Sequence, residues 1–140
     1  MLENIVINNP IKERIERENG RLLMIQNSSQ LALQISKIID KKKGQDICVM
    51  DIHSISSFAD YFIIAHGSSV RQVKAIADEI QEQMEKQGVF LDHIEGYDSG
   101  RWILLDYLSV VVHLFIEEER KFYDLERIWK DAVTANIDNL

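Results

Sequence analysis

The segment His66-Gly67-Ser68-Ser69 carries the residue types that come nearest to a chemical site in this chain. It follows an apolar run and precedes an amphipathic one, so it should lie where a strand meets the N-terminus of a helix. Free backbone N–H groups at a helix N-terminus bind phosphate, which would make this a nucleotide site. However, Ser69 and Gln72 have the spacing of a capping box, and the lysine of a P-loop is missing. We favour a structural cap and keep nucleotide binding as the alternative.

A Gly-Ser pair after a strand is also typical of nucleotidyltransferases, which need two metal-binding carboxylates on a following strand. The next acids in this chain, Asp78 and Glu79, are neighbours on a predicted helix. Adjacent helical side chains point about 100° apart, so these two carboxylates cannot converge on one metal ion. We therefore predict no catalytic residues and no metal site.

The histidines and the single cysteine offer no alternative chemistry. His53, His66, His93 and His113 lack metal-ligand spacing, and no Ser–His–acid set can be nominated by position. His113, inside the run VVVHLF, is expected in the core or at an interface rather than as a catalytic base. Cys48 has no flanking base or cation, so we expect a buried, inert thiol. No cofactor is expected.

What remains is a candidate binding surface around one predicted tight turn. Tryptophan, tyrosine and arginine dominate the energetic hot spots of protein interfaces, and here they gather with acidic residues. The residues at and just before the turn are Glu95, Tyr97, Arg101, Trp102, Asp106, Tyr107 and Leu108. Their types favour binding to another protein over catalysis.

The apolar pattern predicts the elements that position these residues. Helices are expected at residues 29–42, 70–87 and 119–131, and strands at 46–52, 61–65, 102–106 and 110–116, with a short extended piece at 89–94. The last two strands should form a hairpin. In the last helix, Phe122, Leu125, Trp129 and Ala132 should face inward.

These elements predict an α/β fold, a single compact domain with a mixed β-sheet flanked by helices. Residues 28–140 form the predicted domain. Residues 1–27 read as a loosely ordered N-terminal extension, because Asn8-Asn9-Pro10 breaks an early strand and a charged stretch with a short helix at 11–18 follows. One hypothesis places the native start at Met24.

Composition and charge limit the function classes. The chain has 140 residues, is 46% hydrophobic and 28% charged, and carries a formal net charge of −7. Phosphate contacts need clustered Lys and Arg, so sequence-specific nucleic-acid binding is not expected, whereas a basic protein partner is. No apolar run approaches the roughly 20 residues that span a bilayer. The single cysteine and the lack of a signal layout predict a cytoplasmic protein without membrane contact.

The chain resembles the ribosomal silencing factor family, also called Iojap-like proteins, over roughly Ser28 to Ala132. The matching motifs are SSFADYFIIAHGSS at 56–69, RQVKAIAD at 71–78, EG at 95–96, WILLDY at 102–107, VVVHLF at 110–115 and RKFYDLERIW at 120–129. Several ordered motifs with family-like spacing make the match specific.

The resemblance implies a fold related to nucleotidyltransferases without their catalytic acids. It also implies binding to ribosomal protein L-fourteen of the large subunit, which would block association with the small subunit and repress translation under nutrient limitation. Self-association, most simply as a homodimer, is implied for the free protein. The implied contact residues are Trp102, Asp106, Tyr107, Leu108 and His113, with Glu95 and Asp60 in addition.

One position departs from the family pattern. After WILLDY the family usually has Gly-Asp, where this chain has Leu108-Ser109. The change removes a residue that adopts positive φ without strain, and it removes an acid that would face a basic partner. The contacts at this turn should therefore differ from those of relatives.

Overall fold

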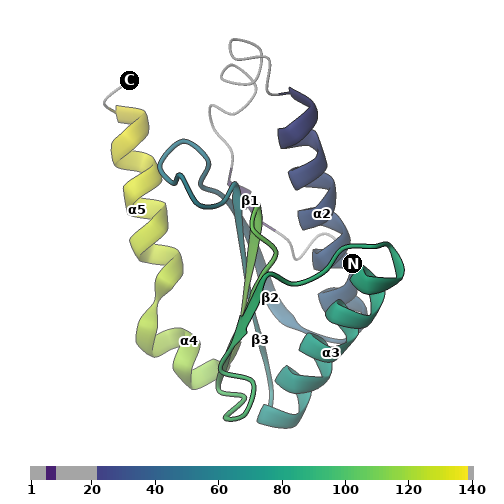
Figure 1. Ribbon diagram of the computed structural model, residues 1–140. Coiled ribbons are helices and arrows are strands. Elements are labelled where there is room, and N and C mark those ends of the chain that lie inside the picture. The colour runs from purple at the N-terminus through teal and green to yellow at the C-terminus, as the bar shows by residue number, and fades with distance from the viewer. Residues whose placement is uncertain (1–5, 9–21, 139–140) are drawn as a thin grey trace.

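A mixed sheet of six strands forms the middle layer of the computed structural model, which describes residues 6–8 and 22–138 (Figure 1). The strands are β1 (Val6–Asn8), β2 (Gln45–Asp51), β3 (Tyr61–Gly67), β4 (His93–Glu95), β5 (Trp102–Asp106) and β6 (Val110–Ile116). The helices are α2 (Leu22–Lys41), α3 (Val70–Lys86), α4 (Glu117–Tyr123) and α5 (Leu125–Asp138). The strand order is β1-β2-β3-β6-β5-β4.

The centre of the sheet is the parallel pair β3 and β6, and every other described pairing except β1 with β2 is antiparallel. Strands β2, β3 and β6 are apolar on both faces because helices cover the sheet on both sides. Helices α2 and α3 lie on one side and α4 and α5 on the other, as Figure 1 shows.

The larger core lies between the sheet and helices α2 and α3. Both helices place an apolar stripe with a spacing of three and four residues against the strands. From α2 come Ala32, Ile35 and Ile39; from α3 come Val73, Ile76, Ala77, Ile80 and Met84; from the strands come Ile47, Val49, Ile63, Ala65, Ile103, Leu105, Val112 and Leu114.

A smaller core lies on the opposite face of the sheet. Met50, Ile64 and Phe115 are buried there, and Leu125 and Trp129 of α5 pack against them. This helix meets the sheet through an edge-to-face contact between Trp129 and Phe62, with ring centroids 4.8 Å apart. Trp102, Leu104 and Val111 on this face remain partly exposed, so α4 and α5 leave part of it open.

The predicted fold class is confirmed, and so are the hairpin strands, whose bounds match those expected. The expected second helix is also confirmed, ending one residue earlier than predicted. The first helix begins at Leu22 rather than at residue 29, and the extended piece before the hairpin is a strand only at His93–Glu95. A short strand β1 pairs parallel to β2, although the Asn-Asn-Pro sequence argued against an early strand.

The last helix was predicted wrongly as one continuous element. Helix α4 ends at Tyr123, the next residue Asp124 has left-handed backbone angles (φ 50°, ψ 48°), and α5 then runs in a new direction (Figure 1). The turn also reverses the prediction for Phe122, whose side chain is 79% exposed instead of inward. Leu125 and Trp129 do pack on the sheet as expected, and the Ala132 side chain lies outside those described.

The short helix predicted at residues 11–18 lies outside the described residues. The division into an extension at 1–27 and a domain at 28–140 stays a prediction.

Candidate protein-binding surface

Trp102 lies at the start of β5, on the sheet face that α4 and α5 cover only in part. Its indole stacks on Phe115 with centroids 4.9 Å apart and touches the ring of Tyr123 at 4.7 Å. The indole N–H donates a hydrogen bond to Nδ1 of His113 at 3.2 Å. The side chain remains partly exposed, so a rigidly held aromatic edge faces solvent.

His113 supports Trp102 from within the sheet. Because its Nδ1 accepts the indole N–H, the imidazole proton lies on Nε2, which is buried and has no hydrogen-bond partner in the described part of the chain. Burial lowers the pKa of His113 from 6.5 to about 4, so the ring is neutral at pH 7. His113 is 4% exposed, which makes it a residue that positions Trp102 rather than one that contacts a partner directly.

Acidic side chains share this face with Trp102. Residues two apart on a strand point to the same side, so Trp102, Leu104 and Asp106 project together. The neighbouring strand β4 places Glu95 opposite Leu104 and His93 opposite Asp106, with a contact of 2.9 Å between His93 Nε2 and a Glu95 carboxylate oxygen. We call the set Glu95, Trp102, Leu104 and Asp106 the β4–β5 face.

The hairpin turn lies at one end of the β4–β5 face. An Asp106 carboxylate oxygen accepts a hydrogen bond from the Leu108 backbone N–H at 2.7 Å. Leu108 has a φ of 70°, a conformation that costs a leucine about 1–2 kcal/mol, and its side chain is 60% exposed. The turn therefore has a positive φ at this position although the residue is not a glycine.

Asp60 lies at the same end of the sheet as this turn. Its backbone N–H donates to the Ser109 carbonyl at 2.8 Å, and its carboxylate accepts a hydrogen bond from the Ser28 hydroxyl at 2.8 Å. Asp60 thereby fixes α2 and the β3 entry against the turn. Four of the seven predicted contact residues, Glu95, Trp102, Asp106 and His113, share one sheet face, and Asp60 and Leu108 lie at its end.

Tyr107 is the predicted contact residue that the fold turns away. Its side chain is 6% exposed and belongs to the core under α2 and α3. Burial raises the pKa of its hydroxyl to about 12, and that hydroxyl has no partner among the described residues. A role for Tyr107 in binding would therefore be indirect, through the position of the turn.

Gly96 is needed where the loop after β4 passes close to the start of β5. Its φ is +78°, and a Cβ added there would lie 2.0 Å from the Trp102 carbonyl oxygen. Only glycine allows the loop after β4 to pass this close to the start of β5.

Sequence reasoning missed three residues of this region. Leu104 could have been found from the alternation in WILLDY, which places it between Trp102 and Asp106. Tyr123 was treated as part of a helix whose inward face was assigned to Phe122. Phe58 lies within the family-like motif at 56–69 but was not singled out, and its side chain is 90% exposed in the loop that leads into β3.

At the alternative site Gly67–Ser69, both serines already form hydrogen bonds with Gln72. The Ser69 hydroxyl accepts from the Gln72 backbone N–H at 3.1 Å, as a cap should. The capping box is modified, because the Gln72 side-chain oxygen accepts from the backbone N–H of Ser68 rather than of Ser69. The adjacent cavity, about 490 Å³, is also lined by the carboxylates of Glu117 and Glu118, which would repel a phosphate.

The other candidate groups show no reactive arrangement. Burial raises the pKa of the partly exposed Cys48 thiol to about 11, so it is protonated at pH 7. No three His, Cys, Asp or Glu side chains within residues 6–8 and 22–138 come close enough to hold a metal ion. In the same residues no helix is long and apolar enough to cross a bilayer.

The protein is a single α/β domain with a mixed sheet. One face of this sheet presents Trp102, which neighbouring rings hold in place, beside carboxylates. The comparisons give the family. The family described as "Ribosomal silencing factor during starvation" matches residues 25–140, and the chain belongs to this family.

Individual relatives agree with this assignment. The ribosomal silencing factor RsfS of Bacillus subtilis is 46% identical over 99 residues, covering 71% of this chain and 84% of the relative. That of Halalkalibacterium halodurans is 40% identical over 114 residues, covering 81% and 97%. A crystal structure of a Chromobacterium violaceum protein superposes with a TM-score of 0.69 at 38% identity, covering 76% of this chain and 86% of the other. The predicted family is confirmed.

Proposed function

We propose that this chain silences ribosomes by binding ribosomal protein L-fourteen of the large subunit, so that the bound domain blocks association with the small subunit. The proposal rests on membership of a silencing-factor family and places the protein in the cytoplasm, where free subunits occur. The observation that carries the location of the contact is the β4–β5 face, with its partly exposed and rigidly held Trp102.

The chemistry of the face suits a basic protein surface. A tryptophan fixed by stacking loses little side-chain entropy on binding, which is one reason aromatic residues act as anchors. Glu95 and Asp106 add negative charge beside it, and the whole chain carries −7. Complementary charge mainly speeds association and selects the partner.

Co-sedimentation with purified large subunits tests this proposal. Wild type should pellet with the subunits and inhibit their joining with small subunits. Trp102→Ala should weaken both effects by tenfold or more, which corresponds to about 1.4 kcal/mol or more. Trp102→Phe, which keeps a ring for stacking but loses the N–H, should lie between the two.

Two glutamate variants, one on the β4–β5 face and one away from it, supply a matched control. Glu95→Gln removes a carboxylate from the β4–β5 face and should slow association. Glu82→Gln removes an equally exposed carboxylate from α3, on the opposite side of the sheet, and should have no effect. Wild type that fails to pellet with subunits, or pellets without hindering their joining, would overturn the proposal.

Self-association of the free protein stays a prediction, tested by light scattering across a range of concentrations. A mass that remains that of one chain at every concentration would contradict it.

A further inference from the structure

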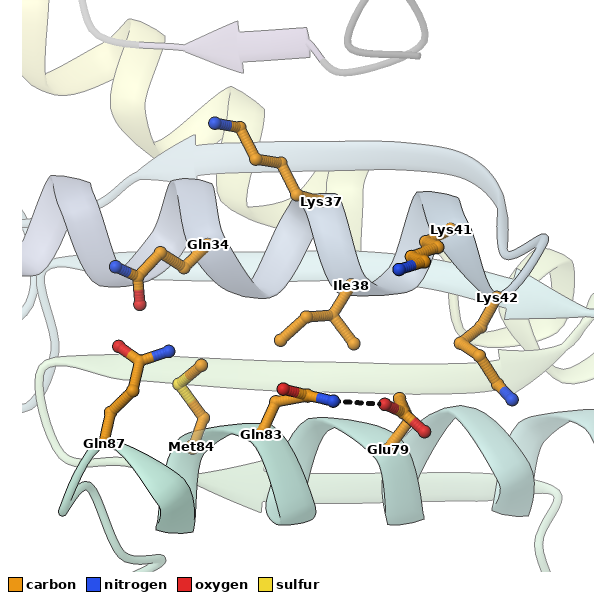
Figure 2. A pocket seen from close by; sticks show the side chains of 9 residues that line it. All are labelled: Gln34, Lys37, Ile38, Lys41, Lys42, Glu79, Gln83, Met84 and Gln87. Carbon is orange, nitrogen blue, oxygen red and sulfur yellow. Dashed lines mark hydrogen bonds between the residues drawn. The ribbon is translucent and has the colours of Figure 1, made fainter.

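A hollow of about 540 Å³ lies between α2 and α3, on the side of the sheet away from the β4–β5 face (Figure 2). Its volume falls within the range of small-molecule sites. The two helices run antiparallel here, so that Gln34 of α2 lies near Gln87 of α3 and Lys42 lies near Glu79. From Gln34 to Lys42 the α2 wall is about 12 Å long.

The chemistry of the hollow changes along this length. At one end the side-chain amides of Gln34 and Gln87 point toward each other across the gap (Figure 2). In the middle, the partly exposed side chain of Ile38 supplies an apolar floor, and Met84 is fully buried beneath it. At the other end the ammonium groups of Lys41 and Lys42 lie along the α2 wall.

These lysines are free of carboxylate partners within the described chain. Some other surface cations are paired, namely Arg101 with Glu119, Arg127 with Asp124, Lys86 with Glu82 and Lys121 with Glu117. Others in the described residues form no ion pair, namely Lys37, Lys43, Arg71, Lys74 and Lys130. Lys41 and Lys42 have no such ion pair in the described residues.

A carboxylate is nevertheless within the same hollow. Glu79 accepts a hydrogen bond from the Gln83 amide at 2.7 Å instead of pairing with a lysine. This end of the hollow therefore has two lysines against one carboxylate and stays positively charged, whereas the cavity beside Gly67–Ser69 is lined by two glutamates and by no lysine or arginine.

The helix dipole alone would place cations at the end of α2. It accounts for Lys41 and Lys42 as residue types in the last turn. It does not account for the apolar floor or for the amides of Gln83 and Gln87, which belong to a different helix. The order of amides, apolar floor and cations matches a ligand that has a polar-edged flat ring at one end and phosphates at the other.

We propose that the hollow between α2 and α3 binds a nucleoside diphosphate or triphosphate. The base lies over Ile38 with its polar edge toward Gln34 and Gln87, and the phosphates lie at Lys41 and Lys42. This site is separate from Gly67–Ser69, and it does not depend on the proposed binding of ribosomal subunits.

Isothermal titration of the full chain with adenosine diphosphate and with guanosine diphosphate tests the site. At least one of them should bind with a measurable Kd, and inorganic pyrophosphate, which cannot use the apolar floor, should bind about tenfold more weakly. The double variant Lys41→Gln, Lys42→Gln should also bind about tenfold more weakly, because both phosphate partners are lost. Gln34→Ala should weaken the diphosphate but leave pyrophosphate unchanged.

Two control variants change residues outside the hollow. Lys121→Gln with Lys130→Gln changes the net charge equally on α4 and α5, and Ser68→Ala alters the Gly67–Ser69 segment; both should bind as wild type does. Absence of binding by wild type, or equal weakening by the two lysine pairs, would overturn the site. Binding of a short oligoribonucleotide that depends on Lys41 and Lys42, without binding of either diphosphate, would replace it with an RNA contact.

Discussion

At the level of single residues, we expect a substitution of Leu108 to have opposite effects on the stability of the fold and on subunit binding. Its left-handed backbone (φ 70°) is strained for leucine, while its side chain is 60% exposed beside the proposed partner face. Leu108→Gly should relieve the strain and stabilise the fold by about 1 kcal/mol, measured by urea unfolding. The same change should weaken subunit binding, because an exposed apolar contact is lost. A variant that is less stable, or that binds subunits more tightly, would contradict this account of the turn.

His113 makes stability depend on pH. Its folded pKa of about 4 lies below the ordinary 6.5 because burial disfavours the charged ring. Between these two values the unfolded chain binds a proton that the folded chain does not, so stability falls as the pH drops from about 6.5 to 4. The loss should reach up to about 3 kcal/mol, measured as the urea midpoint at several pH values.

His113→Gln supplies the control for this pH effect. Glutamine keeps an acceptor for the Trp102 N–H but does not titrate, so the slope between pH 6.5 and 4 should flatten. Some slope should remain, because the pKa of His66 is also lowered, first by burial and then by the nearby Arg120. An unchanged slope would show that His113 does not carry the effect.

At the level of elements, the Arg120 side chain links α5 to strands β2 and β3. It is 8% exposed and forms two hydrogen bonds to the carboxylate of Glu126, at 2.8 and 2.9 Å. It also donates to the carbonyls of Gln45 and Asp46 and to Nδ1 of His66. Since arginine only donates, the His66 proton lies on Nε2, toward the Gln45 side-chain oxygen.

Arg120→Met should destabilise the fold by about 3 kcal/mol, because a half-buried carboxylate and two carbonyls lose their partner. Arg120→Lys should recover only part of this, since an ammonium group cannot reproduce the planar fork. Urea unfolding measures both, and Arg127→Met, which breaks the exposed pair with Asp124, should cost less than about 1 kcal/mol. Equal costs at Arg120 and Arg127 would contradict the assigned role.

The elements also show where sequence reasoning stops. Strong apolar patterns with Gly or polar turns between them predicted β5, β6 and α3 closely. The break between α4 and α5 was missed because neither Gly nor Pro marks it: Asp124 adopts left-handed angles and is stabilised by contacts with Arg120 and Arg127. The Asp124 contact with Arg120 is a backbone hydrogen bond, and the Arg120 side chain spans the break by binding Glu126 of α5.

At the level of the whole molecule, the negative charge should steer partner binding. A chain with net charge −7 that meets a basic protein surface associates faster at low ionic strength. The association rate with large subunits, measured by stopped flow, should therefore fall as salt rises, and Glu95→Gln should reduce that dependence while Glu82→Gln does not. A rate that is independent of salt would mean that the contact is mainly apolar.

The sequence predicted which residues belong to the candidate site, but it did not predict how they are arranged on the surface. Residue types and family-like motifs pointed to Trp102, Asp106 and Leu108; the fold places Trp102 and Asp106 on one sheet face and Leu108 in the turn at one end of it. The inward turn of Tyr107 follows from strand alternation continuing past Asp106, and the support of Trp102 by Tyr123 follows from the unpredicted break. The direction of Tyr107 could therefore have been predicted from local alternation, whereas long-range packing decided the position of Tyr123.

The parallel pairing of β3 with β6 has a consequence for how the protein is made. Residue 61 pairs with residue 110 and residue 67 with residue 116, so the middle of the sheet stays incomplete until the ribosome has released most of the chain. Pairings between such distant segments form slowly, because a long loop must close first. The tryptophan of the β4–β5 face rests on this late strand through His113 and Phe115. A nascent copy therefore acquires the proposed binding face only near the end of its own synthesis.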